Sequence, residues 1–204
     1  MIHLSRLYKD IQNYVQRRFG KGLSILFEIK TYFEKGDIEE RIRYYKKNPE
    51  RLYVDIDDAE NMKNIINETN TKGRNKFNLQ HASTRILIKY NGRDIVNFYS
   101  PGDDNGLWLD YLNVIDDFLQ HNHAVSFYGF EYYKMGIENF DDDKIHFYIM
   151  LEHENIKEIS ATLPKKEFLQ ELINALKYFL VKMDEYKVFE QKNTVRKYKF
   201  NFSN

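Results

Sequence analysis

The stretch TRILIKYNGRDIVNFY, residues 84–99, is the strongest local indication of fold in the chain. Two runs rich in β-branched and aromatic residues flank Asn91 and Gly92, a pair that favours a type I′ turn because both of its central positions need a positive φ. The stretch therefore predicts a β-hairpin with strands over residues 84–90 and 94–99.

Downstream of the hairpin, two helices enclose a run of strands. Residues 107–119 place most of their apolar side chains on one helical face, and residues 165–183, which follow Pro164, carry the clearest apolar stripe in the chain. Alternating patterns between them predict strands over the ranges 125–133, 135–140, 145–151 and 156–163. This order predicts an α+β fold, in which one antiparallel sheet of about five or more strands packs against a helix layer.

Upstream of the hairpin, the pattern is weaker. It predicts an N-terminal amphipathic helix over residues 4–19, a strand over 23–33, a strand over 52–56 and a short helix around 62–66 that follows capping residues at 57–60. Residues 38–47 fit either a short charged helix or a strand. We expect a single domain, 1–204, with a possible junction in the polar stretch 69–80, between an N-terminal α/β segment and a C-terminal α+β module, 81–204. Residues 195–202 alternate and could add a last strand.

Composition excludes several classes of protein. The 204 residues hold 31 Lys and Arg against 31 Asp and Glu, and 42% of them are hydrophobic, which is too apolar and too neutral for a disordered chain. The absence of cysteine excludes disulfide scaffolds, thiolate metal sites and cysteine nucleophiles. No apolar run approaches about 18 residues and the first 20 residues are rich in charge, so we expect neither a membrane span nor a signal peptide, and a cytoplasmic location.

Charge is balanced overall but unevenly distributed. Residues 1–102 have a net charge of +6, residues 103–154 of −10 and residues 155–204 of +4. If the acidic stretch forms one face, it would steer a basic partner to a docking site and would repel nucleic acid. The alternative is a solvated surface that is neutralised by basic residues of 1–102. The expected docking carboxylates are Asp103, Asp104, Asp141, Asp142 and Asp143.

Aromatic residues supply candidate anchors beside those carboxylates. Trp108, the only tryptophan, lies at the start of a predicted helix, where it either packs into the core or meets a partner. Alternation along a strand over 125–133 would place Tyr128 and Tyr132 on the same face. Tyrosine and tryptophan dominate interface energetics, so Trp108, Tyr128 and Tyr132 complete the predicted docking site.

Catalytic and metal-binding motifs are weak. The sequence contains no Gly-x-Ser-x-Gly, Walker A or Rossmann glycine pattern, so we expect a chain that is not an enzyme and that needs no cofactor. A competing hypothesis is a metal-dependent hydrolase that uses the histidines at 121, 123, 146 and 153. The loop over residues 100–106 offers oxygen ligands but lacks the EF-hand series, and it therefore favours no calcium site. A structural or oligomerisation module is the third possibility.

Two segments carry a resemblance to known proteins. GLWLDYLNVIDDFL (106–119) and ATLPKKEFL (161–169) resemble segments of small uncharacterised bacterial proteins, and the sheet–helix–sheet–helix plan of residues 84–183 is similar to that of immunity proteins against polymorphic toxins. The resemblance implies a cytoplasmic, non-enzymatic inhibitor, acidic where it covers a basic nuclease toxin. The partner expected from it is another protein, such as a basic toxin.

Overall fold

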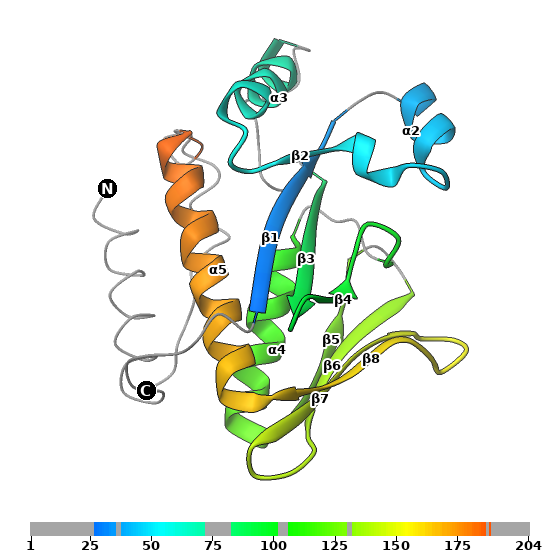
Figure 1. Ribbon diagram of the computed structural model, residues 1–204, viewed down its shortest axis with the longest axis vertical. Coiled ribbons are helices and arrows are strands. Elements are labelled where there is room, and N and C mark those ends of the chain that lie inside the picture. The colour runs from blue at the N-terminus through cyan, green and yellow to red at the C-terminus, as the bar shows by residue number, and fades with distance from the viewer. Residues whose placement is uncertain are drawn as a thin grey trace.

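The computed structural model describes residues 27–35, 38–71, 83–101, 106–129, 132–186 and 188 (Figure 1). The predicted N-terminal helix and the predicted last strand, 195–202, lie outside these residues. The elements follow one another in this order: β1 (Phe27–Glu34), α2 (Ile38–Tyr44), the 3-10 helix η1 (Pro49–Leu52), β2 (Tyr53–Asp55), α3 (Ala59–Thr71), β3 (Thr84–Tyr90), β4 (Arg93–Val96), α4 (Leu107–His121), β5 (His123–Phe127), β6 (Tyr133–Asn139), β7 (Lys144–Leu151), β8 (Ile156–Pro164) and α5 (Lys165–Glu185).

The strands of the described residues form two antiparallel sheets of four strands each. Sheet A has the order β2-β1-β3-β4, and sheet B has the order β5-β6-β7-β8. The α+β class with antiparallel strands is therefore confirmed, whereas the expectation of a single sheet is wrong. The chain leaves sheet A at the short strand β4, crosses through α4 and begins a second meander at β5, and β4 lies beside β8 (Figure 1).

The hairpin predicted from Asn91 and Gly92 is present as β3 and β4. Both turn residues adopt the left-handed region, with φ of 50° at Asn91 and 74° at Gly92, as a type I′ turn requires. Residues before and after the polar stretch 69–80 belong to the same sheet, because β1 pairs with β3 along seven residues from Phe27↔Tyr90 to Phe33↔Thr84.

Residues 38–71 adopt mostly helical structure. The ambiguous stretch 38–47 begins with helix α2, and the short helix expected around 62–66 extends over all of α3. Asp58 caps α3, because its carboxylate accepts a hydrogen bond from the Asn61 backbone N–H at 3.1 Å and another from the Asn61 side chain at 2.7 Å. The side-chain bond from Asn61, followed by the backbone bond, lowers the pKa of Asp58.

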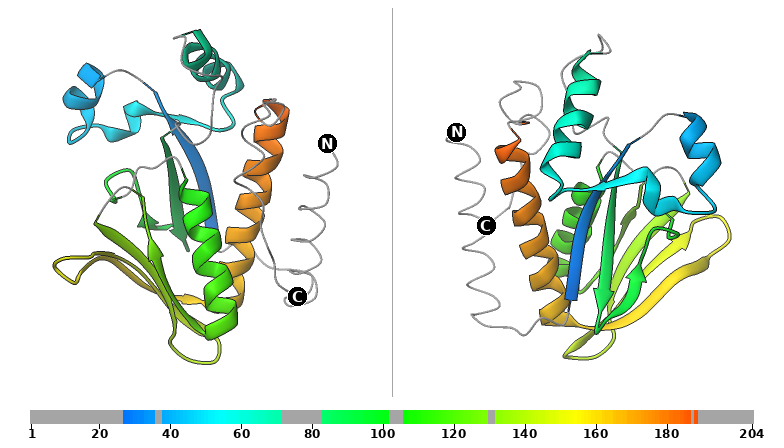
Figure 2. Two further views of the ribbon diagram at one scale, coloured as in Figure 1. Left: turned by 180° about the vertical axis from the view of Figure 1, so that it is seen from behind. Right: turned by 45° about the horizontal axis from the view of Figure 1, so that its top comes forward.

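Helices α4 and α5 cover the inner faces of both sheets (Figure 2). Phe168 of α5 lies 5.5 Å from Phe27 of sheet A and 5.3 Å from Phe147 of sheet B, measured between ring centroids. Phe33 stacks on Phe179 of the same helix. One hydrophobic core therefore spans both sheets. The buried stripe of α5 comprises Phe168, Leu169, Leu172, Ile173, Leu176, Phe179, Leu180 and Met183.

The strand expected over 125–133 is interrupted. β5 ends at Phe127, Gly129 has φ of 66° and Tyr132 has φ of 90°, and β6 begins at Tyr133. Gly129 is the residue that allows this turn, because a residue without Cβ adopts positive φ readily. Aromatic residues continue the alternating pattern through the turn, so periodicity alone does not reveal it.

Leu176→Asp tests the placement of α5. Leu176 is buried between the sheets, and an unpaired charge there is expected to lower the free energy of unfolding by several kcal/mol. Val181→Asp introduces the same charge at an exposed position of the same helix and should change the melting temperature little. Thermal unfolding followed by circular dichroism compares the two variants, and equal melting temperatures would contradict the packing described here.

Candidate protein-docking surface

Trp108 belongs to the core and not to a docking surface. Its side chain is 3% exposed, and its indole N–H donates to the Thr31 hydroxyl of β1 at 3.1 Å. The ring also lies near Tyr111 and Phe179. The expectation that Trp108 anchors a partner is therefore wrong, because its polar group already has a partner in sheet A.

Tyr128 and Tyr132 do not share a face. Tyr128 is 1% exposed and packs edge-on against Tyr111, whereas Tyr132 is exposed and its ring lies 5.3 Å from that of His153. The positive φ at Gly129 and Tyr132 breaks the alternation on which the prediction depended. Of the two, only Tyr132 is available to a partner.

The acidic stretch 103–154 does not form one continuous face. Asp103 and Asp104 lie outside the described residues. Glu152 and Glu154 lie in the β7–β8 turn, at the opposite end of sheet B from the β6–β7 turn that contains Asp141, Asp142 and Asp143. Glu152 is paired with Lys134 at 2.6 Å, and this hydrogen bond lowers the pKa of Glu152.

One part of the stretch does come together, at the end of sheet B where α4 stops. The Asn139 N–H donates to the Asn122 carbonyl at 3.2 Å, and the Lys165 N–H donates to the Asp143 carbonyl at 2.8 Å. The Lys165 ammonium lies over the Phe118 ring of α4. These contacts bring the last turn of α4, the β6–β7 turn and the first turn of α5 together. We call the carboxylates gathered there the acidic end: Asp116, Asp117, Asp141, Asp142 and Asp143.

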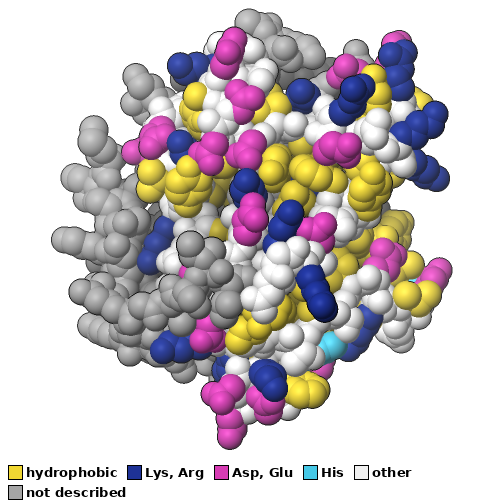
Figure 3. Space-filling model, viewed as in Figure 1, with side chains coloured by type: hydrophobic (Ala, Val, Ile, Leu, Met, Phe, Trp, Pro, Cys, Tyr) yellow, Lys and Arg dark blue, Asp and Glu magenta, His cyan; other side chains and the backbone are white. Residues whose placement is uncertain are grey.

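The acidic end is solvated and only partly neutralised. Asp141, Asp142 and Asp143 are all exposed. Asp141 accepts a hydrogen bond from the Asp143 backbone N–H at 3.0 Å and lies 3.6 Å from the Lys144 ammonium. In Figure 3, acidic side chains lie at the lower end of the molecule beside basic and exposed hydrophobic ones, where Figure 1 places the β6–β7 turn.

Exposed apolar side chains lie at the acidic end and on strand β5. Phe140, directly before the three aspartates, is 63% exposed. On β5, Val125 is 41% and Phe127 is 66% exposed, and Phe127 pairs with Lys134 toward the opposite end of sheet B. Sequence reasoning missed these residues as anchors. One signal was present for Phe140, since it stands between Asn139 and an acidic turn, where a core position is rare.

The four histidines of the metal hypothesis are not gathered into a site. Within the described part of the chain, no group of three or more His, Asp or Glu side chains is placed to hold a metal ion. His123, Glu138 and His146 do lie opposite one another across β5, β6 and β7. However, Glu138 accepts a hydrogen bond from the Tyr148 hydroxyl at 2.9 Å, and a ring nitrogen of His146 lies 3.2 Å from the Ser160 hydroxyl.

Tyr148 lies flat over sheet B on the face away from the helices. Its ring crosses Gly136 of the neighbouring strand, where an added Cβ would be 2.1 Å from the ring, and the Lys157 ammonium lies 4.1 Å from the ring centroid. Burial, followed by the hydrogen bond to Glu138, raises the pKa of Tyr148 to about 12. The hydroxyl is therefore a donor that keeps its proton at neutral pH.

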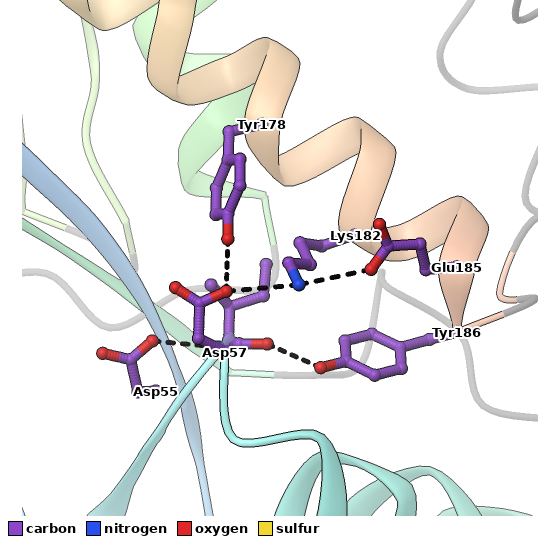
Figure 4. A network of polar contacts seen from close by, with 7 residues as sticks. Asp55, Asp57, Tyr178, Lys182, Glu185 and Tyr186 are labelled. Atoms are coloured by element: carbon purple, nitrogen blue, oxygen red, sulfur yellow. Dashed lines mark hydrogen bonds and ion pairs between the residues drawn. The ribbon is translucent and has the colours of Figure 1, made fainter.

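A second polar cluster joins the β2–α3 turn to α5 (Figure 4). The Tyr178 hydroxyl donates to the Asp57 carboxylate, and Lys182 lies 3.3 Å from Asp57 and 3.2 Å from Glu185. The Tyr186 hydroxyl donates to the Ile56 carbonyl at 2.7 Å. We call these residues the Asp57 cluster.

The chemistry of the Asp57 cluster is structural. The hydrogen bond to Asp57 raises the pKa of Tyr178, so that the phenol is a poorer acid and not an activated one. The bond to Glu185, with a second one to Asp57, raises the pKa of Lys182. General acid–base catalysis needs a group whose pKa lies near the working pH, and both of these shifts point away from it. The cluster therefore holds the turn against the helix.

Arg85 is a further polar residue that the sequence did not single out. It lies on the outer face of sheet A and is buried. Its guanidinium donates to the carbonyls of Phe98 and Ser100 at 2.6 and 2.7 Å, and lies 5.2 Å from the Tyr53 ring centroid. These bonds satisfy a turn that would otherwise leave carbonyl groups unpaired, which indicates a structural role.

Tyr178→Phe tests the Asp57 cluster. Removal of the hydroxyl deletes one hydrogen bond to a carboxylate that keeps its contact with Lys182, so the free energy of unfolding should fall by about 1 kcal/mol. Tyr99→Phe removes the same atom from an exposed tyrosine outside the cluster and serves as the control. Urea unfolding measures both variants, and an unchanged value for Tyr178→Phe would show that the hydrogen bond from Tyr178 to Asp57 contributes nothing to stability.

Tyr148 predicts a dependence of stability on alkaline pH. Its folded pKa of about 12 exceeds the unfolded value of about 10, so the folded state holds the proton more tightly. The stabilisation is complete below pH about 10 and is lost as the pH rises through about 12. The difference in unfolding free energy between the wild type and Tyr148→Phe should therefore shrink over this interval in urea titrations. A difference that stays constant there would contradict the assignment.

Comparisons with known proteins give no direct indication of function. No protein-family model, no curated protein and no solved structure matches the chain. Among the described residues, no helix is both long and apolar enough to cross a membrane. Function is therefore inferred from the surface of the chain itself.

Proposed function

We propose that this chain is a non-enzymatic protein-binding factor, an immunity-like inhibitor that neutralises a basic partner by docking it at the acidic end. The observation that supports this proposal is the convergence of carboxylates from α4 and the β6–β7 turn beside the exposed ring of Phe140. Among the described residues, Lys144 pairs with Asp141 and His121 lies 3.6 Å from Asp117, while the Lys165 ammonium donates to Asn139 and not to a carboxylate of the acidic end.

The combination of charge and exposed aromatic surface suits a docking site. Carboxylates at a rim attract a basic partner over a distance of about 8–10 Å and accelerate association, while they contribute modestly to affinity. Affinity comes mainly from a few apolar side chains that lose contact with water. Phe140 is the side chain at the acidic end with the exposure and size to take that role.

The carboxylates of the acidic end are poor candidates for acid–base catalysis. A catalytic carboxylate needs a desolvated environment that raises its pKa, and Asp141, Asp142 and Asp143 are exposed. The metal-dependent alternative is tested by elemental analysis of protein purified without a metal-affinity tag. Stoichiometric zinc or manganese would overturn the proposal of a non-enzymatic factor.

Substitution of lysine for the three aspartates of the β6–β7 turn tests whether the partner docks at the acidic end. The triple variant Asp141→Lys, Asp142→Lys, Asp143→Lys should fold, since exposed charges contribute little to stability. Its association rate with a partner recovered by pull-down should fall about tenfold or more at low salt, and the salt dependence should flatten.

A second triple variant controls for net charge. Glu50→Lys, Glu60→Lys, Glu154→Lys changes the total charge equally at exposed positions outside the acidic end. Its association rate should lie much closer to that of the wild type. Equal effects of the two triple variants would mean that only total charge matters, and an unchanged rate for the first would contradict docking at the acidic end.

A further inference from the structure

Strand β5 lies at an edge of sheet B, with β6 on one side and no described strand on the other. Two hydrogen bonds continue its ladder: Asn139 N–H to the Asn122 carbonyl at 3.2 Å, and Tyr128 N–H to the Tyr133 carbonyl at 3.0 Å. Bonded and non-bonded pairs alternate along an antiparallel ladder, so residues 122, 124, 126 and 128 bond to β6. The backbone N–H and C=O groups of residues 123, 125 and 127 therefore point toward the open edge.

The same three residues present their side chains on the exposed face of the sheet. His123, Val125 and Phe127 are all exposed, and Ala124 between them is buried. Natural edge strands are commonly protected by lysine, proline or a bulge. The strand His-Ala-Val-Ser-Phe contains neither residue, and its register with β6 has no shift.

Two acidic side chains of α4 lie near the two ends of this edge. The Asp110 carboxylate accepts a hydrogen bond from the Gly129 N–H at 3.2 Å, just beyond the end of β5. Asp117 lies two turns further along α4, in the last turn before β5 begins. Helix α4 therefore runs alongside β5 and places carboxylates near both of its ends. Two copies paired through β5 would bring these carboxylates together, which disfavours self-association.

We infer that the β5 edge receives an extended basic segment of the partner protein as an additional strand of sheet B. This inference rests on the proposed function and specifies how the partner binds. The backbone groups of residues 123, 125 and 127 bond to the added strand, Val125 and Phe127 contact its alternate side chains, and the flanking carboxylates select lysine or arginine.

Hydrogen exchange on the full chain tests the inference with a defined probe, a synthetic peptide of about seven residues in which lysine and valine alternate. Upon addition of the peptide, the amides of Val125 and Phe127 should exchange at least tenfold more slowly. The amides of Ala124 and Ser126 already bond to β6 and should change less. A peptide that alternates glutamate with valine should give no protection, and added salt should weaken the effect.

Val125→Pro removes one N–H that points to the open edge and removes no hydrogen bond to β6. An edge strand accepts proline at such a position. This variant should reduce peptide affinity at least tenfold, whereas Val125→Thr, which keeps the N–H and the shape of the side chain, should change affinity less than threefold. Equal affinity of the two variants would overturn the inference. Binding without protection at residues 125 and 127 would overturn it independently of whether the proline variant folds.

Two further outcomes separate this inference from its alternatives. Protection of the amides at 125 and 127 in the free protein would overturn the inference, because the edge would already be occupied. The occupant would be a second copy or another segment of the chain, and sedimentation distinguishes the two. If the triple aspartate variant leaves the partner's association rate unchanged while the peptide still protects β5, the acidic end fails as a docking site and the strand-addition edge stands.

Discussion

Both sheets bury their inner faces against the same helix, α5, and Phe168 in its first turn contacts a ring from each sheet. Sheet A alone would leave Phe27 and Phe33 uncovered, and sheet B alone would leave Phe147 uncovered. Burial of apolar area stabilises each sheet by roughly 25 cal/mol per Å², so the two sheets and the helix are stable only as a unit. The placement of every surface residue, including those of the acidic end, depends on this shared core.

Local patterns in the sequence predicted the elements better than their assembly. Asn91-Gly92 predicted the type I′ hairpin because the chemistry of a two-residue turn is local. The apolar stripes predicted α4 and α5 because helical periodicity extends over many residues. The division into two sheets was not predictable, since it depends on which edges meet after the chain has passed through α4. The end of β5 at Phe127 was missed because the aromatic pattern of the sequence continues without a break to Tyr133.

The candidate site shows the same contrast between features that depend on local sequence and features that depend on distant contacts. The β6–β7 turn with its three aspartates was predicted, because consecutive acidic residues in a short connection are exposed in nearly every fold. The aromatic anchors were not, because exposure depends on distant contacts: Trp108 is buried against Phe179 and donates a hydrogen bond to Thr31, 77 residues away in sequence. The orientation of the β5 backbone is likewise a property of its register with β6, which no single strand reveals.

The position of α5 in the chain has a consequence for synthesis. The eight strands of the described residues all precede α5, so during translation they leave the ribosome before the helix that covers their inner faces. The contact between Asp57 and Tyr178 spans 121 residues and cannot form until α5 is complete. Large apolar surfaces and an open strand edge on a nascent chain promote aggregation. The complete core of this protein therefore forms only after residues 165–185 have been synthesised, and until then the inner faces of both sheets lack the helix that covers them.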